Sequence, residues 1–319
     1  MAEIIVNKTS IEKFLTNYNI GKLVSFKHVK KGFANLVYYL KTTKGEYILK
    51  IELRNNPNDR FKYEIELLEF LKGLPVPKII RTKDRKLFIR YQGVNGAFIY
   101  NYLSGQNINK FSKNQLEQVG TLLGKVHLKT TKFRSPVKRM KLYTISPNSF
   151  KLMASLNKET KDKKILAAFD YIKKELPKYI LPASLPQGSM HMDFKPGNTL
   201  FERGKLSGLI DFDNAYRGPL IFDLAHTIMW FCPKRKKFDK DGVRAVYKAY
   251  NKIRPLSKLE KKYFWKALNY SCLSLCFVDI YYFIYKKKLN SQYLNWVLDN
   301  ILPAQKHLAL HKYDFDLFK

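Results

Sequence analysis

The sequence has few of the residues that build stapled, fibrous or low-complexity chains. Its 3 cysteines cannot form a disulfide framework, and an odd count is typical of a reducing compartment. The 15 glycines and 13 prolines among 319 residues exclude a collagen-like or repetitive chain. The start, Met1-Ala2-Glu3, lacks the basic and apolar run of a secretory signal. These scarcities predict a cytoplasmic globular protein.

Acidic residues are also scarce, with 26 Asp and Glu against 59 Lys and Arg and a formal net charge of +33. Such an excess attracts polyanions such as nucleic acid or an anionic membrane. The lysines are spread along the whole chain, however, and clusters such as Lys234–Lys237 and Lys286–Lys288 are short. We interpret the charge as mainly compositional, with a basic polyanion-binding surface as the alternative.

Long apolar runs are missing as well. The longest stretch without Lys or Arg near the C-terminus, Ala267–Tyr285, is marginal for a membrane span of about 20 residues. It contains Asn269, Ser271, Ser274 and Asp279, which are costly in hydrocarbon. Because hydrophobic residues make up 45% of the chain, a large core is available. We expect a buried helix here and no membrane span.

Extended patterns dominate the first hundred residues. Val37–Ile51 predicts a hairpin around Lys44-Gly45, and Lys86–Arg90 and Ala97–Tyr100 predict two further strands. Between them, Phe61–Leu71 has apolar residues at helical spacing.

After Leu103-Ser104-Gly105 the pattern becomes helical, beginning with Asn114–Leu128, and stays so except around residues 186–223. We therefore predict an α+β protein with a small antiparallel-sheet lobe over residues 1–100 and a larger helical lobe over 101–319.

The chemistry is concentrated in Leu185–Asp223. This segment contains His191-x-Asp193-x-x-x-x-Asn198, two short apolar runs joined through Arg203-Gly204, and then Asp211. A hairpin closing at the glycine would bring Asn198 beside Asp211. An amide oxygen and a carboxylate suit Mg²⁺, and Asp193, nearby, could orient a hydroxyl nucleophile and accept its proton.

This pattern resembles the catalytic loop and metal-binding aspartate of protein-kinase-like phosphotransferases. It is more similar to the aminoglycoside phosphotransferase/choline kinase family, and the runs Leu206–Phe212 and Gly218–Ala225 are most similar to the homoserine kinase branch. The resemblance covers nearly the whole chain, with recognisable motifs from Lys27 to Trp230. It implies a bilobal protein-kinase-like fold and an ATP- and Mg²⁺-dependent kinase.

The resemblance also implies roles around the loop. Asp193 would be the catalytic base or orienting group, and Lys195 would reach the γ-phosphate. Metal ligation falls to Asn198 and Asp211, with Asp213 as a further metal or supporting acid. His191 would brace the loop and Asp223 would fasten it from behind through hydrogen bonds; both jobs are structural.

In the N-terminal lobe, Lys50 matches the strand lysine that contacts the α- and β-phosphates. Glu64 would pair with it, with Glu66 as a rival. The resemblance also implies a glycine-poor turn over the phosphates, with Gly32 and Asn35. A linker with Asn101 and Leu103 would hydrogen-bond the adenine edge through its backbone.

The acceptor is a small molecule with a hydroxyl, and several classes stay open. Homoserine is favoured by Leu206–Ala225, choline or ethanolamine by Asp213, and an aminoglycoside or sugar remains possible. Asp279 is a candidate contact for a cationic acceptor. The alternative from another class is a degenerate kinase fold that binds polyanions, although Lys50 and Asp193 argue against it. A metal site at His307-x-x-x-His311 is a minor alternative to a plain surface helix.

Overall fold

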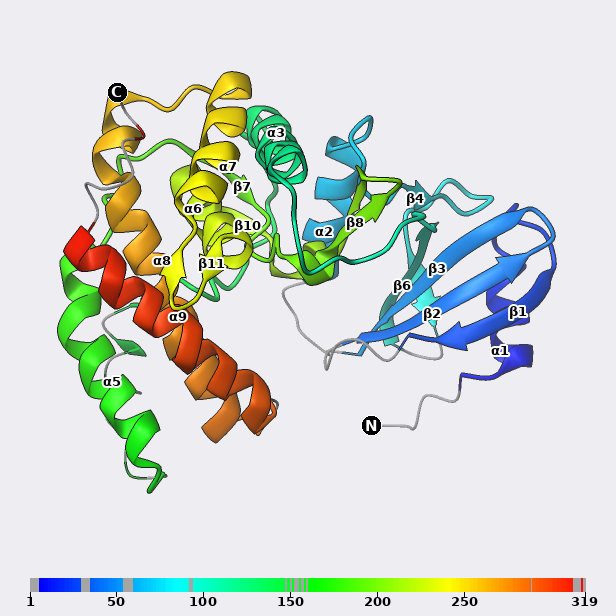
Figure 1. Cartoon of the computed structure of the whole chain (residues 1–319). Coiled ribbons are helices and arrows are strands. Elements are labelled where there is room, and N and C mark those ends of the chain that lie inside the picture. The colour runs from blue at the N-terminus through cyan, green and yellow to red at the C-terminus, as the bar shows by residue number, and fades with distance from the viewer. Residues whose placement is uncertain are drawn as a thin grey trace. The chain divides into compact units, whose positions relative to one another are not determined.

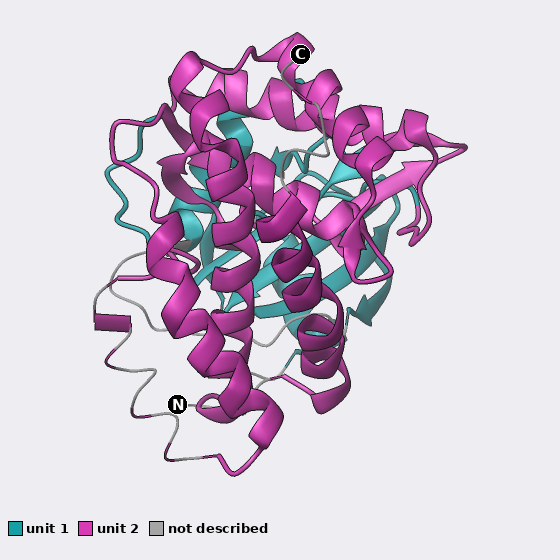
Figure 2. Cartoon of the chain, turned by 60° about the vertical axis from the view of Figure 1, so that its left-hand side comes forward, with its two compact units in different colours: residues 1–105, 134–139, 207–213 teal, residues 106–133, 140–206, 214–319 magenta. Residues whose placement is uncertain are grey.

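The computed structural model describes residues 6–29, 35–53, 60–91, 94–146, 148–149, 151, 155, 158, 160–287, 289–311 and 317. The chain divides into two compact units, coloured separately in Figure 2. Unit 1 contains residues 1–105, 134–139 and 207–213, and unit 2 contains residues 106–133, 140–206 and 214–319. Both units are therefore discontinuous in sequence.

Unit 1 is built on an antiparallel sheet with the strand order β1-β2-β3-β6-β4, and β5 also pairs with β6 (Figure 1). The strands are β1 (Leu23–His28), β2 (Asn35–Thr42), β3 (Gly45–Glu52), β4 (Ile79–Ile80), β5 (Ile89–Tyr91) and β6 (Val94–Asn101). The expected hairpin is present as β2 and β3, and the expected helix as α2 (Arg60–Phe70).

Two expectations for unit 1 were wrong. The first hundred residues contain a second helix, α1 (Lys8–Leu15), which the extended pattern hid. A reciprocal capping box between Asn7 and Ser10 starts this helix, and its apolar residues pack in the core beside the sheet. The strand expected over Lys86–Arg90 begins only at Ile89, because the preceding residues form a turn in which Arg85 is left-handed (φ 61°).

Unit 2 is mainly helical. Its described helices of eight or more residues are α3 (Lys113–Thr130), α5 (Lys163–Glu175), α6 (Leu220–Phe231), α7 (Lys240–Ile253), α8 (Lys258–Ile284) and α9 (Ser291–His311). Helices α3 and α7 approach closely at Gly120, where a Cβ atom would lie 2.2 Å from the carbonyl oxygen of Val246. In Figure 1, α8 runs between α6 and α9, which both contact it.

Helix α8 is long and apolar enough to cross a membrane, but 78% of its apolar window is buried inside the fold. It is thus a core helix, as the polar residues within Ala267–Tyr285 predicted. Cys272 and Cys276 lie on it as buried free thiols.

Short strands frame the motif-bearing segment. β7 (Gln187–Met190) pairs with β10 (Tyr216–Pro219), and β8 (Thr199–Glu202) pairs with β9 (Lys205–Leu209). The turn between β8 and β9 has positive φ at both Arg203 (49°) and Gly204 (78°), which is the geometry of a type I′ hairpin and explains the glycine. A further small hairpin, β11 (Pro233–Lys234) with β12 (Lys237–Phe238), was not predicted, and the basic cluster Lys234–Lys237 forms it.

Candidate active site

Lys50 is the centre of a charged corner in unit 1. Its Nζ lies 2.6 and 2.9 Å from the two carboxylate oxygens of Glu64 on α2, and 3.9 Å from Oδ1 of Asp213. The side chains of Lys50 and Glu64 are buried. The ion pair predicted between β3 and α2 is therefore present, and the rival Glu66 instead accepts a hydrogen bond from Ser135.

The charges in this corner do not balance. Burial by itself would lower the pKa of Lys50, but the carboxylates of Glu64, Asp213 and Asp211 outweigh it and raise that pKa. Burial raises the pKa of Glu64 to about 7 against the lowering effect of Lys50, and Asp213 adds to the increase. Lys50 thus stays protonated among an excess of acids, which favours the arrival of another cation.

The segment after β6 was expected to meet an adenine ring through its backbone. The N–H of Asn101 donates to the carbonyl of Lys78, and that of Tyr102 donates to the carbonyl of Glu46. Asn101 also receives a hydrogen bond from the Lys78 N–H at its side-chain oxygen, 2.7 Å away. Asn101 therefore fastens the sheet, and the role of Leu103 stays a prediction.

Of the two residues expected over the phosphates, Gly32 lies outside the described residues. Asn35 opens β2 and is paired in register with Glu52 on β3.

In unit 2, Asp193 is held by two residues of its own loop. Asn198 donates from Nδ2 to the carbonyl oxygen of Asp193 at 2.9 Å and to its Oδ2 at 2.8 Å. The ammonium of Lys195 lies 2.8 Å from Oδ1 of Asp193. The Asp193 side chain is only 7% exposed, so its carboxylate is fixed in one direction.

The loop is fastened from behind by Asp223, at the first turn of α6. Its carboxylate accepts the N–H of His191 at 2.7 Å and that of Met192 at 2.9 Å. Met192 is left-handed (φ 59°), so these two bonds hold a backbone turn that would otherwise relax. His191 in turn accepts the N–H of Asp193 at Nδ1. The structural jobs predicted for His191 and Asp223 are confirmed.

The residues behind Asp223 were not predicted from the sequence. His127 on α3 donates from Nε2 to Asp223 at 2.9 Å, and its Nδ1 accepts the hydroxyl of Tyr250. Arg254 then donates both to Tyr250 and to Glu260. Burial lowers the pKa of His127, which keeps the imidazole neutral and fits this donor–acceptor order. No local motif marks these residues, which come from α3, α7, α8 and the Arg254 turn.

A second carboxylate group of unit 2 interacts with the loop. Burial raises the pKa of Asp279 on α8 to about 7, and Tyr293 of α9 donates to its Oδ2 at 3.1 Å. The charges of Asp193 and Lys195 act on it as well. Burial raises the pKa of the Tyr143 phenol, and the charges of Asp193 and Asp279 raise it further. An aromatic and acidic patch of unit 2 therefore lies near Asp193.

Two other aromatic residues of unit 2, Tyr270 and Trp296, have different surroundings. Tyr270 is a core residue whose hydroxyl accepts the N–H of Ile145. Trp296 is 42% exposed and stacks on Trp230, whose ring also faces the ammonium of Lys195 at 5.5 Å.

Residues with oxygen donors for a metal occur in both units. The described residues contain no cluster of three or more His, Cys, Asp or Glu arranged for a metal ion. Asn198 uses its side-chain nitrogen on Asp193, so its oxygen is the atom left for a cation. Asp211 is left-handed (φ 67°), a conformation that a non-glycine residue adopts only when its surroundings hold it. Amide and carboxylate oxygens are ligands that Mg²⁺ prefers, so each of these residues is chemically suited to hold it.

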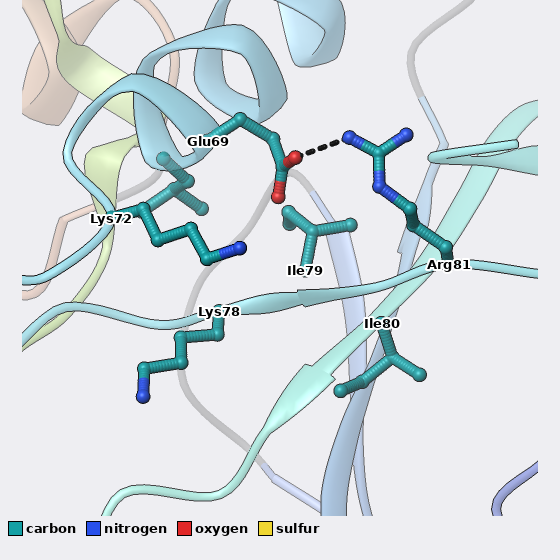
Figure 3. A pocket seen from close by; sticks show the side chains of 7 residues that line it. Glu69, Lys72, Lys78, Ile79, Ile80 and Arg81 are labelled. Atoms are coloured by element: carbon teal, nitrogen blue, oxygen red, sulfur yellow. Dashed lines mark hydrogen bonds and ion pairs between the residues drawn. The ribbon is translucent and has the colours of Figure 1, made fainter. Parts of the chain in front are cut away.

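A separate hollow of about 340 Å³ lies in unit 1 between the end of α2 and β4. Figure 3 shows Glu69 and Arg81 paired across it, with Lys72 and Lys78 on the opposite side. None of the predicted site residues lines it, so it is not part of the candidate active site.

Comparison with known proteins places these observations in a family. Residues 25–256 match the model of the phosphotransferase enzyme family (APH). The homoserine kinase of Pseudomonas aeruginosa (strain LESB58) is 28% identical over 275 residues, which are 84% of each chain.

Two solved structures share the fold. The amicoumacin kinase hAmiN superposes with a TM-score of 0.67 at 16% identity, over 95% of this chain and 94% of that one. The microcompartment-associated aminopropanol kinase gives a TM-score of 0.64 at 14% identity, over 98% and 99%. The protein-kinase-like α+β fold is thereby confirmed.

The family match covers most of the chain, and the homoserine kinase relative is matched over 84% of its length. ATP use follows from this kinase assignment. The chain belongs to the phosphotransferase enzyme family and is a small-molecule kinase that acts on a hydroxyl acceptor.

Proposed function

We propose that this kinase transfers the γ-phosphate of Mg·ATP to the hydroxyl of a small amino alcohol, with homoserine as the first candidate, in the cytoplasm. The observation that carries the proposal is the fixed carboxylate of Asp193, held by Asn198 and Lys195 and close enough to Asp279 for their charges to interact. A buried acid fixed in this way can orient a hydroxyl and accept its proton.

The roles are assigned unit by unit. In unit 1, Lys50 would bind the α- and β-phosphates, Glu64 would hold Lys50 in place, and the backbone of Leu103 would meet the adenine. The raised pKa of Lys50 supports its part, since the lysine remains charged in a buried position. Asp211 would be a metal ligand from this unit and Asp213 a supporting acid.

In unit 2, Asp193 would align the acceptor hydroxyl for in-line attack, and Lys195 would neutralise charge on the γ-phosphate. The side-chain oxygen of Asn198 would ligate the metal. When bound, Mg²⁺ would offset the negative charge on the nucleotide phosphates. Positioning and electrostatics then supply most of the rate acceleration.

An amino alcohol is supported by Asp279. This acid lies in an aromatic setting with Tyr293 and Tyr143, which suits an ammonium group. An ammonium ion beside Asp279 would stabilise its charged form, which burial disfavours. Homoserine is supported by the curated relatives, and the aminopropanol kinase structure bears the name of an amino alcohol.

The test is ADP release from Mg·ATP against a panel of homoserine, ethanolamine, choline, sugars and aminoglycosides. We expect homoserine to give the highest kcat/KM. The matched compound 4-hydroxybutyrate, which lacks the amino group, should be at least about tenfold poorer, since a charge-assisted hydrogen bond is lost. Turnover with sugars and none with amino alcohols would overturn the acceptor class.

A further inference from the structure

The segment of residues 134–139, here called the strap, belongs to unit 1 although both neighbouring stretches of chain belong to unit 2 (Figure 2). It has no helix or strand of its own. Its described contacts reach α2 and the Asp211–Asp213 segment, which are far away in sequence. A short irregular segment that joins two such elements is a candidate for a positioning role.

The strap contacts α2 on both sides of Glu64. Ser135 donates its hydroxyl to Oε2 of Glu66 at 2.5 Å. The guanidinium carbon of Arg139 lies 5.5 Å from the centre of the Tyr63 ring. These contacts hold the helix that carries the partner of Lys50.

Arg139 also reaches the acidic segment. Its guanidinium donates from Nη2 to the backbone carbonyl oxygen of Asp213. The carboxylate of Asp213 faces Lys50 at 3.9 Å, and Asp211, two residues earlier, is left-handed. A left-handed non-glycine residue is strained, so it needs outside contacts to persist. The hydrogen bond from Arg139 to Asp213 holds the same short segment.

We propose that Arg139 is a positioning residue that keeps the Asp211–Asp213 segment in register with α2, so that Asp211 presents its carboxylate to the metal of a bound nucleotide. The guanidinium suits this task because its planar face covers an aromatic ring while its edge donates hydrogen bonds. It also adds positive charge to an acid-rich corner. The inference rests on the metal role proposed for Asp211.

The experiment is calorimetric titration of the whole protein with ADP, with and without Mg²⁺, so that no turnover is involved. Arg139→Met should weaken Mg·ADP binding about tenfold, the effect of losing one charge-assisted hydrogen bond. Binding of metal-free ADP should change less than about twofold, because Asp211 does not contact that ligand in the proposal. Arg139→Lys should fall between Arg139→Met and the wild type.

The matched control is Lys138→Met, which removes an exposed cation from the neighbouring position and should leave both affinities unchanged. Equal losses for Mg·ADP and metal-free ADP, or no loss in either Arg139 variant, would overturn the inference. If Arg139→Met does not fold, Arg139→Lys decides by the same criterion. A wild-type protein that binds ADP equally with and without Mg²⁺ would instead remove the proposed metal role itself.

Discussion

In unit 2, Asp223 is completely buried and its carboxylate accepts hydrogen bonds from two backbone N–H groups and from His127. In unit 1, Lys50 is surrounded by the carboxylates of Glu64, Asp211 and Asp213, and Asp213 is 18% exposed. The first arrangement pairs its charge with donors of the fold itself. The second contains more acid than one lysine can neutralise.

This difference separates a structural network from a binding site. We call the network of Asp223, His127 and Tyr250 behind the Asp193 loop the brace. Burial by itself would raise the pKa of Asp223, but the hydrogen bonds from His127 and from the backbone N–H of His191 outweigh it and lower that pKa. A fully satisfied network of this kind stabilises the fold and leaves nothing for a ligand. An acid-rich corner with raised pKa values is instead typical of a site that receives a cation.

The largest effect on stability is expected at Asp223. Asp223→Asn leaves His127 and the loop N–H groups facing an amide, so we expect a loss of about 3–5 kcal/mol in the free energy of unfolding. Urea unfolding followed by circular dichroism measures it. Asp170→Asn, an exposed aspartate on α5, is the control and should change little. A loss below about 1 kcal/mol would mean that the network is not the brace described above.

Lys50→Met tests the binding role of the acid-rich corner in unit 1. We expect kcat/KM for ATP to fall about 100-fold, since a preorganised charge on the phosphates is lost. The unfolding midpoint should change little, because Glu64 can take up a proton in its acid-rich surroundings. Steady-state kinetics and thermal unfolding provide the two readings, with the exposed Lys41→Met on β2 as control. Loss of stability with unchanged kinetics would reverse the roles of the two regions.

Tyr250→Phe probes the far end of the brace. It removes the hydroxyl between His127 and Arg254 and leaves two buried polar groups with one partner fewer. We expect the free energy of unfolding to fall by about 1–3 kcal/mol, with kcat unchanged within about twofold. A large fall in kcat at full stability would show that this network takes part in catalysis.

The last prediction of this comparison concerns pH and Asp279. The folded protein keeps the Asp279 proton up to about pH 7, whereas an unfolded chain releases it near 3.8, the ordinary pKa of an aspartate. Raising the pH between these values therefore favours unfolding, by up to about 4 kcal/mol at pH 7 for this group. Tyr293, Lys195 and Asp193 also influence the Asp279 carboxyl group, and all three are kept when only Asp279 is replaced.

Asp279→Asn should remove this contribution, so that stability falls less steeply than in the wild type as the pH rises from 4 to 7. Urea unfolding at several pH values measures both slopes. Identical slopes would show that Asp279 ionises normally in the folded protein.

The sequence was sufficient where signals are local. Patterns within about twenty residues predicted the β2–β3 hairpin, helix α2 and the turn at Arg203-Gly204. The motif around Asp193 indicated the family. The predicted partnership of Lys50 with Glu64 came from the resemblance and is present in the structure.

Long-range partners were out of reach of this approach. His127 and Asp223 are 96 positions apart, and Arg139 meets Asp213 across 74. The residues next to His127 and Arg139 in sequence do not indicate these contacts, because the contacts depend on how helices and loops pack. Helix α1 is different, because its signal is local. The capping box at Asn7 marks its start, but the surrounding extended pattern hid this short helix.

The most direct measurement is single-turnover phosphate transfer by Asp193→Asn with Mg·ATP and the best acceptor of the panel. The amide keeps the shape of the side chain but cannot take the proton of the hydroxyl. We expect the rate to fall by about 10³-fold, within the range of a lost general base, while Mg·ADP still binds within about threefold of the wild type. A variant that keeps more than about a tenth of the wild-type rate would contradict the role of Asp193 and the mechanism built on it.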